Sequence, residues 1–298
     1  MAVLPVDVDL ALGDDQGVDL ALIQWHTPVP DPTAQDLAIA AYIAKGKEGI
    51  LSELIAWLGD DPRRCKTYRP LFVVAPELSL PYSLDNKLME LASSVERPVV
   101  IIAGFEYLAW EDYQAAVRRS KNPGSERDWL NNPDARPYVN AARILIRDSS
   151  GTISQFVQPK QYPADPEAHL LPKGLPAILF RSQAAPGQRI NFAARVCSDL
   201  SHPDKARQFR RDCALAAPAS PLDITFVLQC NEDQAATQFL QSIQAYFEPP
   251  VAMTETDVGC LVFVNNVGSE WGSLEQFGYS QALRHLSVID ERTFSDRA

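Results

Sequence analysis

Short runs of consecutive apolar residues recur along the chain, and they limit its possible folds more than any other feature. These runs are continuous rather than alternating, which is typical of strands buried on both faces of a sheet. Segments between them carry apolar residues at helical spacing. This alternation predicts an α/β fold with helices packed on the faces of the sheets. The predicted strands are residues 18–25, 71–76, 98–105, 141–148, 190–197, 224–231 and 259–266.

Three segments carry the helical pattern, and two glycines in the first of them, Gly46 and Gly49, could divide it into two helices. No linker separates two halves of the chain, so we expect one domain over residues 1–298. Within it we expect an N-terminal extension and a polar insertion broken by Pro and Gly, which is too long for a simple connection. The predicted helical segments are 32–60, 84–96 and 232–248, the extension is 1–17, the insertion is 110–138, and a hairpin is predicted over 147–160.

Composition narrows the classes of partner. The chain has 298 residues, 46% of them hydrophobic, and a formal net charge of -11. An acidic surface repels nucleic acid and anionic lipid, so we expect a small-molecule substrate and neither a nucleic-acid nor a membrane partner. No window approaches the ~18 uncharged apolar residues of a membrane span, and the acidic N-terminus does not resemble a signal peptide. These features predict a cytoplasmic protein.

The cysteines and histidines do not form metal-binding or disulfide patterns. There are five cysteines and four histidines, with wide spacings and no CxxC, HxxxH or HExxH. An odd number of scattered cysteines argues against a disulfide framework and favours a reducing compartment. We therefore expect no metal site.

Three reactive side chains follow apolar strands, and strand ends are where open α/β folds place their chemistry. Glu77 follows the run 71–76, where partial burial would raise its pKa and suit a general base. Lys160 follows the second arm of the predicted hairpin and could hold an oxyanion or lower the pKa of a thiol. For each residue the alternative is an ordinary charged side chain at the start of a loop.

Cys197 stands where the predicted strand 190–197 meets the polar turn "SDLSHPD". A thiol on such a turn can act as a nucleophile, and the backbone N–H groups beyond it can stabilise an oxyanion. The alternative is a buried structural cysteine. A Cys197–His202 pair is conceivable, but "SHPD" is more simply a turn before a helix that starts near Asp204.

The order of these three residues resembles the Glu-Lys-Cys triad of the carbon–nitrogen hydrolase, or nitrilase, superfamily. The matching positions are Glu77 in "VVAPELSLP", Lys160 in "VQPKQYPADPE" and Cys197 in "RVCSDLSHPDKAR". The resemblance extends over residues 18–290 and includes "LALIQW" and the late segment "FVNNVGSEWGSLEQFGYS". Four features differ from the family, including Pro159 before the lysine and an insertion, 110–138, that is longer than usual. Ser198 replaces the usual aromatic residue after the cysteine, and the Arg-Ala-x-Glu-Asn pattern is missing.

The resemblance implies a four-layer αββα sandwich, a homodimer or higher homo-oligomer, and no cofactor. It implies that Glu77 is the general base, Cys197 the nucleophile, and Lys160 with the Ser198 N–H the oxyanion holder. Glu167 resembles the second glutamate of the family, which orients the lysine. The implied reaction is hydrolysis of an amide, an N-carbamoyl compound or, less commonly, a nitrile through a thioester.

Substrate choice would depend on the walls of the site. Candidates are Tyr138, Asn231 and Glu232, although Asn231 could equally be a helix N-cap. The insertion offers further candidates, namely Trp110, Tyr113, Arg118, Arg119 and Trp129. Two other functions stay open: an acyltransferase of the same fold, and a binding or regulatory module that kept the fold without turnover. The domain could also work with a fused or separate partner.

Overall fold

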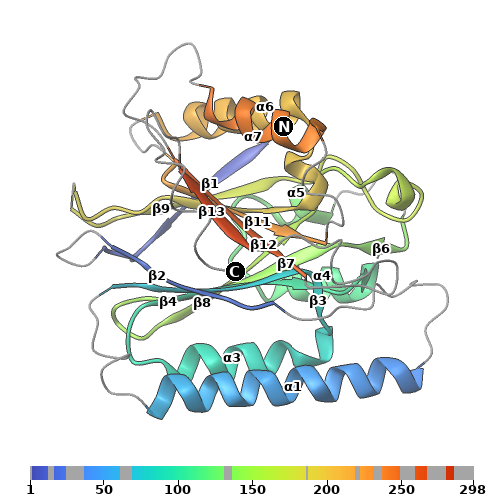
Figure 1. Cartoon of the computed structure of the whole chain (residues 1–298), viewed down its shortest axis with the longest axis vertical. Helices are drawn as coiled ribbons and strands as arrows, with labels where there is room; N and C mark the ends of the chain where they lie inside the picture. Colours follow the sequence, from blue (N-terminus) through green and yellow to red (C-terminus); the bar gives the residue numbers. More distant parts are fainter. Residues whose placement is uncertain are drawn as a thin grey trace.

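Two sheets lie face to face, and helices cover the outer face of each, as Figure 1 shows. The predicted αββα sandwich is therefore confirmed. The structure, a computed structural model, describes residues 2–12, 17–24, 37–60, 69–130, 136–185, 187–218, 222–230, 237–248, 259–266 and 280–284.

The first sheet has five strands in the order β2-β3-β4-β7-β8. Strand β3, which lies between β2 and β4, is buried at all ten positions, as expected for a strand in the interior of a sheet. Two helices, α1 (Leu37–Asp60) and α3 (Asp85–Ser94), pack on its outer face. The strands are β2 (Asp19–Leu22), β3 (Leu71–Leu80), β4 (Val99–Phe105), β7 (Ala141–Arg147) and β8 (Ile153–Pro159).

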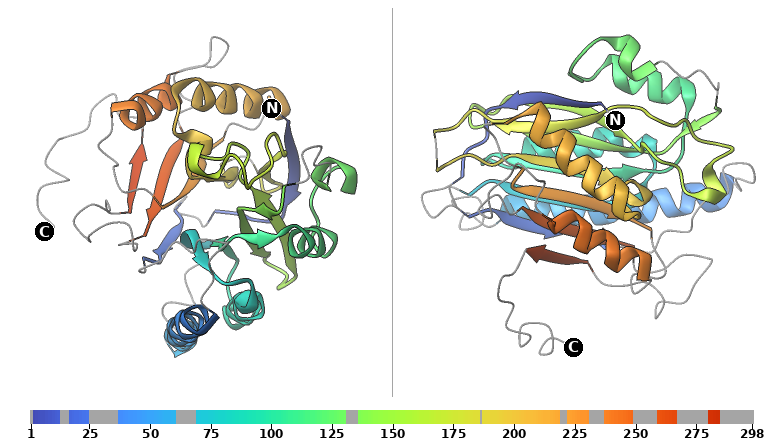
Figure 2. Two further views of the ribbon diagram at one scale, coloured as in Figure 1. Left: turned by 90° about the vertical axis from the view of Figure 1, so that its right-hand side faces the viewer. Right: turned by 90° about the horizontal axis from the view of Figure 1, so that it is seen from above.

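The second sheet has six strands in the order β1-β9-β10-β11-β12-β13. Two helices, α6 (Pro203–Ala216) and α7 (Thr237–Phe247), lie side by side over its outer face, as Figure 2 shows. The strands are β1 (Val3–Val8), β9 (Ala177–Ser182), β10 (Phe192–Val196), β11 (Ile224–Gln229), β12 (Cys260–Asn265) and β13 (Gln281–Arg284).

All seven predicted strands are present, and the predicted hairpin is formed by β7 and β8 around Asp148 and Gly151. The segment 1–17, expected as an extension, contributes β1, which pairs in parallel with β9. Neither β1 nor β9 was predicted. β1 is only partly buried and includes a proline, so its apolar pattern is weak.

Helix α1 runs without interruption through Gly46 and Gly49, so the alternative of two helices is wrong. Both glycines are exposed, and a Cβ at either would touch nothing within 4 Å. An exposed glycine costs a helix only about 1 kcal/mol relative to alanine. Burial of Leu51 and Leu58 on the opposite face outweighs this cost.

The main hydrophobic core lies between the two sheets. Phe72 of β3 stacks on Phe226 of β11, with ring centroids 5.0 Å apart, and meets the edge of Phe192 at 5.2 Å. A second cluster fills the space between the six-stranded sheet and the helices α6 and α7. This packing holds the two sheets in one relative position. It therefore also fixes the positions of residues that follow strands of the two different sheets.

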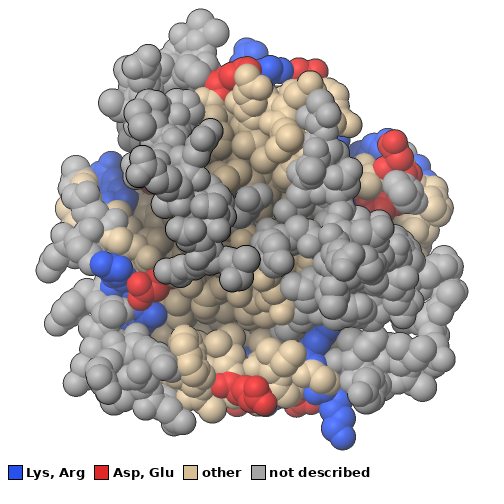
Figure 3. All heavy atoms as spheres, in the orientation of Figure 1, with Lys and Arg blue, Asp and Glu red and all other residues tan. Residues whose placement is uncertain are grey.

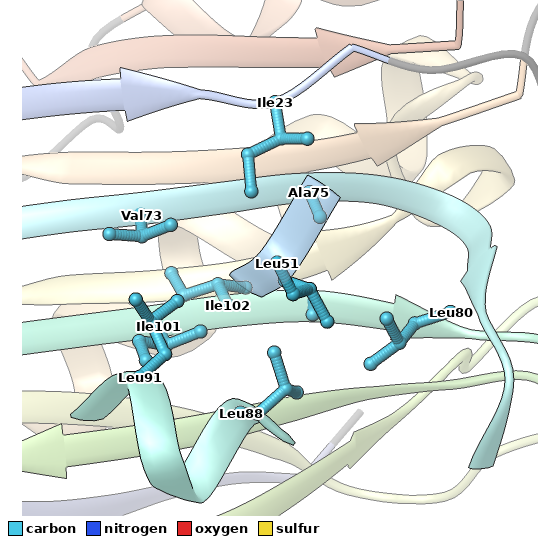
Figure 4. Close-up of a pocket in the computed structure, with 10 residues that line it drawn as sticks. Ile23, Leu51, Val73, Ala75, Leu80, Leu88, Leu91, Ile101 and Ile102 are labelled. Carbon is cyan, nitrogen blue, oxygen red and sulfur yellow. The ribbon is translucent and has the colours of Figure 1, made fainter. Parts of the chain in front are cut away.

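A gap under α1 and α3 is lined by apolar side chains such as Leu51, Val73, Leu88 and Ile101, as Figure 4 shows. It has no room for a water molecule. We therefore regard it as packed core rather than a binding site.

The insertion 110–138 contains α4 (Trp110–Arg118), α5 (Glu126–Leu130) and the first residue of β6 (Tyr138–Val139), which pairs with β5 (Leu108–Ala109). The hydroxyl of Tyr113 donates to the Trp129 carbonyl at 3.1 Å, and both side chains belong to the main core. The expectation that these two aromatic residues line a pocket is therefore wrong: they hold the insertion on the sandwich.

Surface charges of both signs are mixed on the face shown in Figure 3. In one surface ion pair, the Arg207 Nε lies 2.6 Å from Glu248 Oε2. Of the helices in the described part of the chain, none has the length and apolar character that a bilayer crossing requires.

Candidate active site

Glu77 lies in an irregular part of β3, further along the strand than the sequence predicts. Residues 76–79 lie between the paired positions Ala75 and Leu80, whereas only Gly104 lies between their partners on β4. Leu78 has φ 52°, a left-handed conformation that is costly for a branched side chain. This bulge places the Glu77 side chain in the interior between the sheets, where it is only 2% exposed.

Lys160 follows directly after β8, as predicted, and its backbone N–H donates to the Asn140 carbonyl at 2.8 Å. Its side chain is buried and reaches two carboxylates. The Nζ atom lies 2.7 Å from Glu77 Oε1 and 2.6 Å from Glu167 Oε2. A buried ammonium needs such partners, because an unpaired buried charge is very costly.

Cys197 follows directly after β10 and begins a 3₁₀ turn, Cys197–Leu200, as the predicted strand-to-turn junction requires. Its φ of 42° is left-handed, a strained conformation for a residue with a side chain. The Cys197 thiol and the Glu77 carboxylate lie close enough to shift each other's pKa. The structure therefore brings Glu77, Lys160 and Cys197 together, although they come from three distant parts of the chain.

Asp199 joins the cysteine turn to the lysine loop. Its Oδ1 accepts hydrogen bonds from the backbone N–H groups of Gln161 and Tyr162, both at 2.8 Å. Its Oδ2 lies 3.3 Å from Arg195 Nη2, and both side chains are fully buried. The relative position of Cys197 and the lysine loop is therefore fixed by one buried carboxylate.

Glu167 lies in a short 3₁₀ turn, Asp165–Glu167, and is buried. Its Oε1 accepts from the Tyr107 hydroxyl at 2.7 Å, and its Oε2 accepts from the Ala164 N–H at 2.9 Å as well as from Lys160. The predicted contact between Glu167 and the lysine is thus present. Because the Tyr107 hydroxyl and the Ala164 N–H fix its carboxylate, Glu167 holds the Lys160 ammonium in place.

Several groups around the site were not assigned from the sequence. Asn140 donates from Nδ2 to Glu77 Oε1 at 2.8 Å, and Asn266 donates to the Glu77 carbonyl at 3.0 Å. The Cys230 N–H donates to Glu77 Oε2 at 3.1 Å, so Cys230 borders the site. The available signal was position: Asn140, Cys230 and Asn266 each stand directly before or after an apolar strand.

Burial and charge shift the pKa values of the four central groups. Burial raises the pKa of Glu77, and Lys160 only partly offsets this effect. Burial and the negative charge of Glu77 raise the pKa of the Cys197 thiol well above its usual range. For Lys160, burial opposes the charge, but the surrounding anions outweigh it and the pKa is raised. Burial likewise opposes ionisation of Glu167, but Lys160 prevails and lowers its pKa.

These shifts describe a site in which the thiol keeps its proton at rest. When Glu77 takes that proton, the negative charge moves from the carboxylate to the sulfur. The charge beside the Lys160 ammonium stays the same during this transfer. The arrangement can therefore generate a thiolate without bringing a new charge into a buried site.

The other predicted residues have different positions. The Ser198 hydroxyl donates to the Tyr162 carbonyl, so this side chain is used internally. His202 is the N-cap of α6 and accepts from the Asp204 N–H at 3.3 Å, which supports the turn interpretation rather than a Cys–His pair. Tyr138 is half-buried in β6. Asn231 and Glu232 lie outside the described residues, and a substrate contact by any of these three remains a prediction.

A metal centre has no candidate ligands within the described ranges, where no three His, Cys, Asp or Glu side chains gather in a suitable way.

The fold of the chain is that of the nitrilase superfamily. Nit3 of Saccharomyces cerevisiae, a member of branch 10 of that superfamily, is similar in structure with a TM-score of 0.51, 12% sequence identity, and coverage of 90% of this chain and 82% of that chain. No protein-family model matches the chain, and no curated protein matches it in sequence.

Two further similar structures are of an amidase from Nesterenkonia sp. AN1. A cysteine-to-alanine mutant in complex with butyramide has a TM-score of 0.47 and 12% identity over 90% of this chain and 83% of that chain. The amidase after removal of its tag has a TM-score of 0.41 and 14% identity over 94% of this chain and 96% of that chain.

Proposed function

We propose that this chain is a carbon–nitrogen hydrolase that cleaves an amide or N-carbamoyl substrate through a thioester on Cys197. The observation that carries the proposal is the buried Glu77 carboxylate, which bonds the Lys160 ammonium at 2.7 Å and lies close enough to the Cys197 thiol to shift its pKa. A base, a nucleophile and a cation grouped in one buried site are what acyl transfer from an amide requires. The nitrilase-superfamily fold agrees with this assignment.

In the proposed reaction Glu77 takes the thiol proton while the Cys197 sulfur attacks the carbonyl carbon. The resulting oxyanion is held by the Lys160 ammonium and the Ser198 backbone N–H, and one such donor is worth roughly 3 kcal/mol in comparable sites. Glu77 then gives its proton to the leaving nitrogen as the C–N bond breaks. A water molecule, activated by the same carboxylate, attacks the thioester and releases the acid and the free thiol.

Ammonia or amine release from a panel of simple carboxamides, N-carbamoyl compounds and nitriles tests this proposal. We expect release from the first two classes by the purified protein and none by the Cys197→Ala variant. Equal release by both proteins would contradict the assignment. Hydroxylamine in the assay, with analysis of the product acids and hydroxamates, separates hydrolysis from acyl transfer.

We also expect a homodimer in which the helical layer formed by α6 and α7 meets its copy. Two large apolar side chains on these helices are exposed, Leu215 at 68% and Leu240 at 54%. Light scattering should show a dimer, and Leu215→Glu with Leu240→Glu should give a monomer. Ile50→Glu on α1, at the opposite face of the sandwich, is the control and should leave the dimer intact. A monomeric wild-type protein would contradict this expectation.

A further inference from the structure

We propose that Asn140 is a positioning residue that holds the Glu77 and Glu167 carboxylates together and leaves Glu77 Oε2 as the atom that takes the Cys197 proton. This inference rests on the proposed function and adds the assignment of one proton to one oxygen atom. It also gives a role to the Asn140 side chain, which acts on Cys197 only through Glu77, the proposed base.

Asn140 lies at the centre of the site. It stands between β6 and β7 and is fully buried. Its Nδ2 lies 2.8 Å from Glu77 Oε1 and 3.4 Å from Glu167 Oε1, so one amide group bridges the two carboxylates. Its backbone carbonyl accepts the Lys160 N–H at 2.8 Å. A single residue therefore contacts the proposed base, the second glutamate and the backbone of the lysine.

The carbonyl oxygen of the same amide indicates that Asn140 acts in the site as a hydrogen-bond donor. The Oδ1 atom is buried and accepts no hydrogen bond within the described part of the chain. Rotation of the amide by half a turn would point this oxygen at two carboxylates, which is electrostatically unfavourable, so the orientation is set by the site. A buried acceptor without a donor costs stability, and contact with the two carboxylates accounts for its retention.

The hydrogen bonds of Glu77 then separate its two oxygen atoms. Oε1 accepts from Lys160 Nζ at 2.7 Å and from Asn140 Nδ2 at 2.8 Å, which occupies both of its lone pairs. Oε2 accepts the Cys230 N–H at 3.1 Å, and its other lone pair accepts no hydrogen bond from the residues that the structure describes. The thiol proton of Cys197 therefore goes to Oε2. Without Asn140, Oε1 could also take a proton, and the carboxylate could rotate away from the sulfur.

The charged and titratable groups around Glu77 come from several elements. Lys160 follows β8, Glu167 lies in the 3₁₀ turn after it, Cys197 follows β10, and Tyr107 follows β4. Asn140 is a neutral donor among them. Removal of this donor leaves every formal charge in place but takes one hydrogen bond from the ionised form of Glu77, which raises the pKa of its carboxyl group.

The test compares wild type with Asn140→Leu, which has a similar volume and no donor. The first readout is the rate at which iodoacetamide alkylates Cys197 as a function of pH, followed by mass spectrometry of the Cys197 peptide. The second is the pH profile of kcat/KM on the best carboxamide. We expect the midpoint of the acidic limb to move up by about one pH unit in both profiles. We also expect kcat to fall at least tenfold at neutral pH with little change in KM.

Two further variants support the interpretation. Asn140→Ser keeps one donor and should shift the midpoint in the same direction by less, and it decides the question if Asn140→Leu does not fold. Gln158→Leu is the matched control: Gln158 is fully buried in the same sheet, opposite Ala142, but bonds only backbone groups of Pro159, Pro176 and Ile178. It should lower stability without moving either midpoint.

An unchanged midpoint in folded Asn140→Leu, or an equal shift in Gln158→Leu, would overturn the role of Asn140. This outcome differs from failure of the proposed function. Alkylation of Cys197 needs no turnover, so it reports on Glu77 and Cys197 even if no amide is hydrolysed. Conversely, ammonia release that depends on Cys197 but not on Asn140 would support the hydrolase assignment and contradict only the positioning role of Asn140.

Discussion

Gly104 of β4 lies so close to Glu77 of β3 that a Cβ built on the glycine would be 2.6 Å from the Glu77 Cα. The same Cβ would be 2.4 Å from the carbonyl oxygen of Pro76. Backbone atoms cannot move aside as a flexible side chain can. The bulge that brings the proposed base into the site therefore depends on the absence of a side chain on the neighbouring strand.

Gly104→Ala should consequently damage both stability and activity. We expect a loss of about 1–3 kcal/mol in the free energy of unfolding, as is typical of overpacking, because the new methyl group displaces the bulge. We also expect at least a tenfold fall in kcat/KM, since Glu77 moves with its backbone. Urea unfolding and the ammonia assay measure the two effects.

Gly49→Ala is the matched control, because its Cβ would touch nothing within 4 Å on the exposed side of α1. The same substitution should here stabilise the protein by about 0.5–1 kcal/mol through helix propensity, with unchanged activity. If the two alanine variants unfold at the same urea concentration, the close packing of Gly104 against Glu77 does not contribute to the free energy of unfolding.

The left-handed backbone of Cys197 predicts an unusual order of stabilities. Glycine adopts φ near 42° without strain, whereas alanine does not. Cys197→Gly should therefore be more stable than Cys197→Ala by about 1 kcal/mol, and both should be inactive. Thermal or urea unfolding of the two variants checks this. A less stable glycine variant would mean that the turn is not strained at this position.

Removal of the Lys160 charge should lower the free energy of unfolding strongly. Lys160→Met leaves the buried Glu77 and Glu167 without their shared cation, and loss of one partner of a buried ion pair typically costs about 3–5 kcal/mol. Lys87→Met removes an exposed lysine that pairs with Glu90, and it should change stability little. Similar unfolding midpoints for the two variants would show that the buried cluster does not contribute as described.

The raised pKa of Glu77 sets the sign of the pH dependence. Glu77 must be ionised to accept the thiol proton, so activity should fall as pH drops through its pKa. Because burial raises that pKa, the acidic limb of kcat/KM should lie at higher pH than the usual range of a glutamate. Steady-state rates across the acidic range measure it, and a limb at or below that range would contradict the description of Glu77.

The pattern of apolar runs predicted the α/β fold with helices on the faces of the sheets, because strands buried on both faces leave continuous apolar runs, whereas the αββα sandwich was an expectation from the family resemblance. The pattern also placed Lys160 and Cys197 directly after their strands. It ended the predicted strand 71–76 too early, before Glu77, because the polar "ELS" within β3 resembles a loop. In fact the bulge opposite Gly104 allows these residues to remain in the strand, and its cause lies in another segment of the chain.

The groups that complete the site were not predictable for a similar reason. Asn140 and the Cys230 N–H contact Glu77 only because the two sheets bring them against it. A single sequence does not show which residues this packing brings together. A backbone donor leaves no signal in residue type, so position next to an apolar strand was the one indication that the sequence offered. By contrast, Tyr113 and Trp129 resembled binding residues in a polar segment, yet burial against each other and the core gives them a structural role.

The most direct test of the central claim is the mass of the protein quenched in acid during turnover of a simple carboxamide. We predict an adduct equal to the acyl group, located on the Cys197 peptide and absent from Cys197→Ala, together with ammonia release that requires Cys197. Turnover that persists in Cys197→Ala would contradict the account. So would the combination of no adduct, no ammonia, and alkylation of Cys197 no faster than that of the buried Cys213.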